Sequence, residues 1–175
     1  GEKIKDLVLP ASIDTIRNYV FAGLSSLTSL QLPSTVTHIG NAALYACNSI
    51  KQIEIPASVT SIGSQAFDQC KALSTIKWNA NSYTGKLPFD DVRNQITTVI
   101  IGDSVREIPA SLCARMSKLT QVTIPSSVTA IGNAAFLKCS ALKTVTLPAS
   151  IRTIGDNAFD ECKALSIINL PEGLE

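Results

Sequence analysis

Charged residues and histidine are scarce in this sequence, and their scarcity excludes several classes of protein. Only 17% of the residues are charged, and 15 basic residues nearly balance 14 acidic ones, for a net charge of +1. A nucleic-acid-binding domain normally carries a basic patch or stripe, and a membrane-surface helix carries a basic face. The scattered charges predict neither, and no apolar run reaches the ~18 residues of a transmembrane helix.

Catalytic and cofactor-binding motifs are also missing. The sequence has no P-loop, GxGxxG fingerprint, EF-hand loop or C-x-x-C pair. His38 is the only histidine, so nucleophilic catalysis has a single candidate imidazole base. Asp90 and Asp91 are adjacent carboxylates without an evident partner acid. We therefore expect no catalytic residue, no metal site and no cofactor, and we rank an enzyme behind a binding or a structural protein.

An internal repeat of 23 residues dominates what is present. Residues 53–75 read IEIPASVTSIGSQAFDQCKALST, residues 122–144 read VTIPSSVTAIGNAAFLKCSALKT and residues 145–167 read VTLPASIRTIGDNAFDECKALSI. A fixed period of this length is typical of solenoids. Columns of Pro, Ile, Gly, Phe and Cys keep the same register. The apolar residues that open the copies are Leu7, Leu30, Ile53, Ile76, Val99, Val122, Val145 and Ile168.

The copy at residues 53–75 shows how one coil is built. Apolar and polar residues alternate over residues 51–55, as in a half-buried strand, and Pro56 ends it. A second extended piece reaches Ile62, and Gly63 allows a turn. The spacing of Ala66, Phe67, Cys70 and Leu73 predicts a short helical turn that packs inward. One copy cannot bury these groups alone, so copies must stack.

These features predict an α/β-type repeat solenoid of 23-residue leucine-rich repeats, with short parallel strands plus short helical turns. We expect a single domain over residues 1–175 with about seven coils, of which 76–98 is irregular. The chain opens on Gly1 without a signal peptide and shows no polar capping repeat after Leu174. We therefore expect it to be a fragment of a longer chain.

The pattern L-x-x-I-x-I-P-x-S-V-T-x-I-G-x-x-A-F-x-x-C-x-x-L resembles the BspA-like leucine-rich repeat. The match is nearly letter for letter from Leu119 to Leu142 and from Leu142 to Leu165. The closing Leu becomes Ile50 or Ile96 elsewhere, which keeps that position apolar. The resemblance implies a bacterial or protist surface protein, located extracellularly or on the cell surface and used in adhesion to host or matrix proteins.

The irregular copy departs from the pattern between residues 79 and 95. Asn79 replaces the column Pro, Gly85 replaces the column Ile and Arg93 replaces the column Cys, although the 23-residue spacing from Ile76 to Val99 is kept. Two interpretations stay open. Its aromatic residues either fill a locally wider core or form an exposed binding loop with aromatic anchors. The aromatic residues concerned are Trp78, Tyr83 and Phe89.

The cysteines invite a disulfide or metal hypothesis, which the repeat disfavours. Stacked side chains point in parallel, so neighbouring Cβ atoms stay farther apart than the ~3.8 Å usual in a disulfide. A zinc site needs clustered ligands rather than one per coil. We predict five reduced, buried thiols that act as small apolar groups. The predicted structural core includes Phe67, Cys70, Phe136, Cys139, Phe159 and Cys162.

The outward residues of the strands form two mostly neutral ladders. They are either a solvated sheet face or a broad binding surface of the kind that solenoids use for partners. We predict a non-catalytic binding and adhesion module for proteins, without nucleic acid or membrane insertion. The alternative is a structural spacer or stalk that presents other domains. The candidate ligand-binding residues are Gln52, Thr75, Lys77, Thr98, Gln121, Thr123 and Thr144, with Trp78, Tyr83 and Phe89 from the irregular copy.

Overall fold

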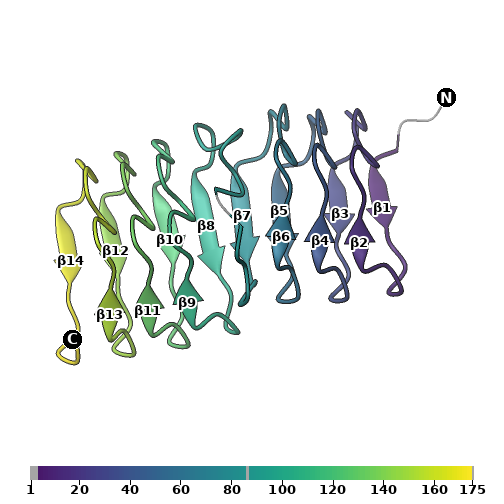
Figure 1. Cartoon of the computed structure of the whole chain (residues 1–175). Coiled ribbons are helices and arrows are strands. Elements are labelled where there is room, and N and C mark those ends of the chain that lie inside the picture. The colour runs from purple at the N-terminus through teal and green to yellow at the C-terminus, as the bar shows by residue number, and fades with distance from the viewer. Residues whose placement is uncertain (1–3, 86, 175) are drawn as a thin grey trace.

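The computed structural model describes residues 4–85 and 87–174, which form a solenoid of two strand layers (Figure 1). Strands β1 and β14 lie at opposite ends of the stack. We call the layer of longer strands the front layer, a name that does not refer to the view in Figure 1. It contains β1 (Asp6–Val8), β3 (Ser29–Gln31), β5 (Gln52–Ile55), β7 (Thr75–Trp78), β8 (Thr98–Ile101), β10 (Gln121–Thr123), β12 (Thr144–Thr146) and β14 (Ile167–Asn169). The back layer contains β2 (Thr15–Ile16), β4 (His38–Ile39), β6 (Ser61–Ile62), β9 (Glu107–Ile108), β11 (Ala130–Ile131) and β13 (Thr153–Ile154).

Every strand pair is parallel and offset by one repeat, which confirms the predicted solenoid. Ile53 pairs with Ile76, and Ile76 pairs with Val99, so the stack continues through the irregular copy. The back layer follows the same rule, with Ile16 opposite Ile39. The 23-residue period of the sequence therefore translates directly into strand register.

The front layer is divided into three hydrogen-bonded sheets, and the widest of them contains the copies that lack proline. The sheets are β1–β3, β5–β7–β8–β10 and β12–β14. Asn79 stands where most copies have proline, and its N–H donates to the Ile55 carbonyl at 3.0 Å. Gly102 does the same to Trp78 at 2.8 Å. A proline cannot make these bonds, so the two copies that lack it belong to the widest sheet.

The core is one continuous cluster that runs from Ile16 to Cys162. Among the described residues, no polar or charged residue is buried. The predicted core members Phe67, Cys70, Phe136, Cys139 and Cys162 are all buried. Phe159, which belongs to the last complete coil, is half-buried and stacks on Phe136 with ring centroids 5.2 Å apart.

The segment that leads from a back strand to the next front strand is a series of tight turns. Ala66, Phe67, Cys70 and Leu73 point inward as the sequence predicts, but the described residues form no α-helix. Gln65 and Gln69 have φ angles of 58° and 59°, in the left-handed region. A left-handed residue breaks the helical hydrogen-bond pattern, so the expected helical turn becomes successive reverse turns.

Side chains of one coil hydrogen-bond to the backbone of the next. The Oδ1 atom of Asn18 accepts from the Asn41 N–H at 2.8 Å, and that of Asn41 accepts from the Ser64 N–H at 2.9 Å. Gly40 leaves the room for this contact, because a Cβ there would lie 2.6 Å from Asn18 Oδ1. Gly63 and Gly155 leave the same room for the side-chain amides of Asn41 and Asn133, whereas Gly132 lies against the backbone of Ala110.

The cysteine column makes a second set of bonds between coils. All five cysteines are free and buried. Cys70 Sγ donates to the Leu44 carbonyl at 3.1 Å, and Cys139 Sγ donates to the Cys113 carbonyl at 3.1 Å. Each acceptor lies 26 residues earlier, in the preceding coil. A thiol suits this position because it combines apolar volume with a weak donor.

The left-handed backbone of the turns predicts that glycine at an exposed left-handed position increases the stability of the protein. We expect Gln65→Gly to raise the free energy of unfolding by about 0.5–1 kcal/mol, because relief of the left-handed backbone exceeds the extra entropy of the unfolded chain. The control Gln52→Gly, on an exposed position of β5, should lower it by a similar amount. Urea denaturation followed by fluorescence measures both, and a loss of stability in Gln65→Gly would contradict the prediction.

The buried thiols predict a loss of stability at alkaline pH. Burial raises the pKa of Cys47 from 9.0 to about 11 and that of Cys70 to about 12. In the unfolded chain these thiols ionise first, so their contribution to stability is complete below pH 9 and is lost as the pH rises toward 11–12.

The measurement is the urea midpoint between pH 8 and pH 11. Wild-type protein should lose stability more steeply than the Cys47→Ala/Cys70→Ala variant, which lacks both thiols. Equal slopes would show that these groups are not buried in the folded state. A thiol reagent should react with five groups in the unfolded chain, in agreement with the five free cysteines.

Candidate binding surface

The outward side chains of the front layer form the two ladders that the alternation predicts. Paired neighbours in β5, β7, β8 and β10 place Gln52, Thr75, Thr98 and Gln121 in one row. The second row of the same four strands contains Glu54, Lys77, Ile100 and Thr123. Thr144 continues the first row on β12, in the next sheet. The structure therefore brings seven of the candidate residues together on one face.

Charges on this face neutralise one another. The Glu54 carboxylate accepts from Lys77 Nζ at 3.4 Å with one oxygen and from Asn79 Nδ2 at 3.0 Å with the other. Thr98 Oγ1 donates to Gln121 Oε1 at 3.4 Å in the first row. Apart from the apolar Ile100, the remaining side chains of the two rows carry hydroxyls and amides, which can both donate and accept hydrogen bonds. The face is therefore nearly neutral and rich in hydrogen-bonding groups.

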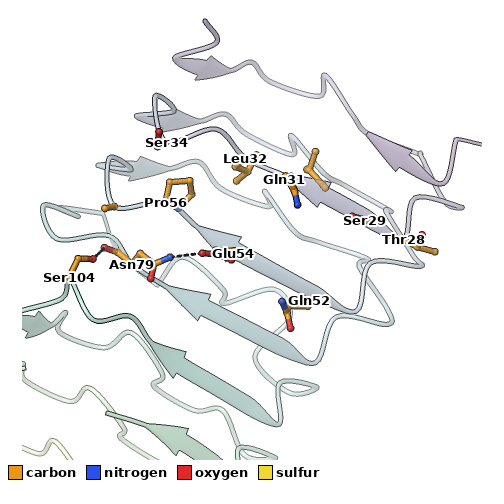
Figure 2. Close-up of a pocket in the computed structure, with 12 residues that line it drawn as sticks. Thr28, Ser29, Gln31, Leu32, Ser34, Gln52, Glu54, Pro56, Asn79 and Ser104 are labelled. Carbon is orange, nitrogen blue, oxygen red and sulfur yellow. Dashed lines mark hydrogen bonds between the residues drawn. The ribbon is translucent and has the colours of Figure 1, made fainter. Parts of the chain in front are cut away.

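A groove of about 630 Å³ opens at the junction of β3 and β5, where two sheets of the front layer meet (Figure 2). Its polar lining includes Gln31, Gln52 and Glu54, while Leu32 and Pro56 supply an apolar wall. Asn79 and Ser104 close one end, and Ser104 Oγ donates to the Asn79 carbonyl at 3.3 Å. Concave sites with apolar walls and a few polar groups are the usual form of binding sites.

Of these groove residues, the sequence predicts Gln52 as a site residue, but neither Asn79 nor Ser104. The sequence could have indicated Asn79, because this residue replaces a column proline and so brings an amide to the end of β7. Nothing in the sequence indicates Ser104, since its place in the groove depends on how its coil packs against the neighbouring one.

The structure resolves the two interpretations of the irregular copy in favour of a filled core. Trp78 is 0% exposed and Phe89 is 2% exposed. Phe89 packs on Phe67 at 5.2 Å and Trp78 meets Tyr83 edge-on at 5.1 Å. Tyr83 is half-buried against the same cluster, and burial raises its pKa to about 12. Trp78 and Phe89 therefore offer no exposed anchor to a ligand, unlike the residues of the ladders.

The side chains that could act in catalysis or bind a metal ion are dispersed over the fold. His38 is exposed on the back layer, with Nδ1 2.7 Å from Thr37 Oγ1. Asp90 forms an ion pair with Arg93. Within residues 4–85 and 87–174, no three His, Cys, Asp or Glu side chains are placed to hold a metal ion. No helix in this part of the chain is long and apolar enough to span a membrane.

Fold and surface together define a leucine-rich-repeat solenoid with an open, polar strand face. The chain belongs to the BspA type leucine rich repeat family, whose sequence model matches residues 1–117 and 106–175 in six copies. No curated protein matches the chain significantly.

Solved structures of bacterial proteins share this architecture. A leucine rich cell surface protein from Faecalibacterium prausnitzii is 31% identical, over 94% of this chain and 47% of its own, with a TM-score of 0.57. A leucine-rich repeat protein from Eubacterium ventriosum is 28% identical, over 98% of this chain and 45% of its own, with a TM-score of 0.71. The chain thus spans less than half the length of either protein.

A third structure, the T. pallidum leucine rich repeat protein, shares the fold. It is 24% identical, over 94% of this chain and 79% of its own, with a TM-score of 0.58.

The packing of the irregular copy predicts that its aromatic residues stabilise the solenoid. We expect Phe89→Ala to lower the free energy of unfolding by about 3–5 kcal/mol, because it leaves a cavity beside Phe67 and Trp78. Tyr83→Phe keeps the ring and removes only a buried hydroxyl, so its stability should stay close to that of wild type. Chemical denaturation followed by Trp78 fluorescence tests both, and an unaffected Phe89→Ala variant would refute this role.

Proposed function

We propose that this chain is a non-catalytic binding module of a cell-surface protein, and that its front layer recognises an extended segment of a host or extracellular-matrix protein. The neutral ladder over β5, β7, β8 and β10 and the adjoining groove carry the proposal. Membership of a family that includes a cell-surface protein supports the location.

The chemistry of the face favours a polypeptide ligand. Coils rise by ~4.8 Å, so four strands and the groove beside them offer a contact surface of roughly 20 Å along the solenoid. Hydroxyl and amide side chains at that spacing can bond to the main-chain groups of an extended segment. The apolar wall at Leu32 and Pro56 can take a side chain of that segment. A strongly charged ligand would find little attraction, since Glu54 and Lys77 are paired.

Lysine substitutions on the front layer test this proposal. The variant Gln52→Lys/Thr75→Lys/Gln121→Lys adds three bulky charges to the first row, and we expect its affinity for the ligand to fall at least tenfold. The assay is binding to a panel of purified matrix proteins, which first selects those that wild-type protein binds. The matched control Thr15→Lys/Ser61→Lys/Thr153→Lys adds the same charge to the back layer and should bind as wild type does.

The outcomes separate a binding module from a spacer. Unchanged affinity in the front-layer variant would remove this face from consideration. Absence of binding by wild-type protein to every member of the panel would favour a spacer or stalk that presents other domains. Circular dichroism of both variants checks that the solenoid stays folded.

A further inference from the structure

A second groove lies on the turns that lead from the back layer to the front layer, in the C-terminal half of the solenoid. Its volume is about 370 Å³. Four successive coils each contribute one cation to its lining, namely Arg93, Arg115, Lys138 and Lys163. Asn94, Ser117 and Ser140 lie among them, and Glu161 is the only acidic residue of the lining. We call this site the basic groove.

The backbone below the basic groove is held by bonds between coils. The Arg115 N–H donates to the Leu137 carbonyl at 2.6 Å, and the Lys138 N–H donates to the Asp160 carbonyl at 2.8 Å. Ser140 Oγ donates to the Ser117 carbonyl at 3.4 Å. Arg115 and Lys138 therefore project from equivalent positions of neighbouring coils, which rise by ~4.8 Å each. Lys163 lies two residues beyond the next equivalent position, which Glu161 occupies.

Two of the four cations are not neutralised. Arg93 pairs with Asp90, and Lys138 pairs with Glu161 at 3.0 Å. Within the described residues, Arg115 and Lys163 form no salt bridge, and both are exposed. The net charge of the whole chain is only +1, so this edge concentrates positive charge. The lining holds four cations and one anion, and such an excess of positive charge attracts anionic ligands.

We propose that the basic groove binds a linear anionic polysaccharide that lies along the solenoid axis. Cations that successive coils contribute match a polymer with sulfate or carboxylate groups along its length. The serine hydroxyls and the Asn94 amide can bond to sugar hydroxyls. No aromatic or large apolar side chain lines the groove, which leaves a single-stranded nucleic acid without a stacking platform and a peptide without an anchor. This site lies apart from the front layer and is independent of its proposed ligand.

Binding of a size-defined heparin oligosaccharide tests the assignment. The variant Arg115→Glu/Lys163→Glu reverses the two unpaired cations, and we expect at least a tenfold loss of affinity. Lys5→Glu/Arg17→Glu makes the same change in formal charge on the N-terminal coils and should bind within twofold of wild type. Wild-type affinity should fall steeply as salt is raised, because exposed charges are screened.

Three results would overturn the proposal. An equal loss in both variants would show attraction by net charge rather than by the groove. Equal binding of uncharged dextran would remove the need for anionic groups. An oligothymidylate of the same charge that binds as tightly as heparin, or more tightly, would show that the groove does not select a polysaccharide. Thermal unfolding of both variants, expected to match wild type, verifies that the coils are intact.

Discussion

The stacking of like side chains at intervals of 23 residues is the constraint on which the structure depends. In the part of the chain that the structure describes, no strand exceeds four residues, and one coil has too little surface to bury its own apolar groups. The core exists only between coils, where Ile53, Ile76 and Val99 lie in register. Amide, hydroxyl and thiol bonds to the preceding coil then hold each coil at that register. A change of one residue in the period would displace all of these contacts together.

Stacking also determines which positions of the sequence can vary. Alternation along a front strand places one residue in the core and the next in solvent. Exposed outward positions can therefore change with little effect on the core, so the chemistry of the two ladders can vary. Here strands β5, β7, β8 and β10 are neutral, with Glu54 balanced by Lys77, while the turn edge holds the unpaired Arg115 and Lys163. One scaffold thus presents two surfaces that differ in charge.

The sequence predicts register, ladders and most core residues, because a period translates directly into stacking. The repeat also indicates that Trp78 is buried, because it occupies the inward strand position between Ile55 and Ile101. Its aromatic neighbours nevertheless left open whether the irregular copy fills the core or forms an exposed loop. The turns were harder to predict. The spacing of Ala66 to Leu73 fits a helix, and left-handed residues such as Gln65 and Lys138 lack the usual glycine or asparagine signature. The junction at β3 and β5 depends on three-dimensional pairing that no single residue indicates.

Departure from the repeat creates the most distinctive part of the front layer. Replacement of proline by Asn79 frees a backbone N–H that joins β7 more fully to β5. The same residue brings a side-chain amide to Glu54 at the edge of the groove. A copy that follows the consensus would give neither contact, since proline has no N–H and no polar side chain. The irregular coil therefore keeps the core closed with its aromatic residues while it shapes the surface beside it, so packing and surface chemistry are set by the same few substitutions.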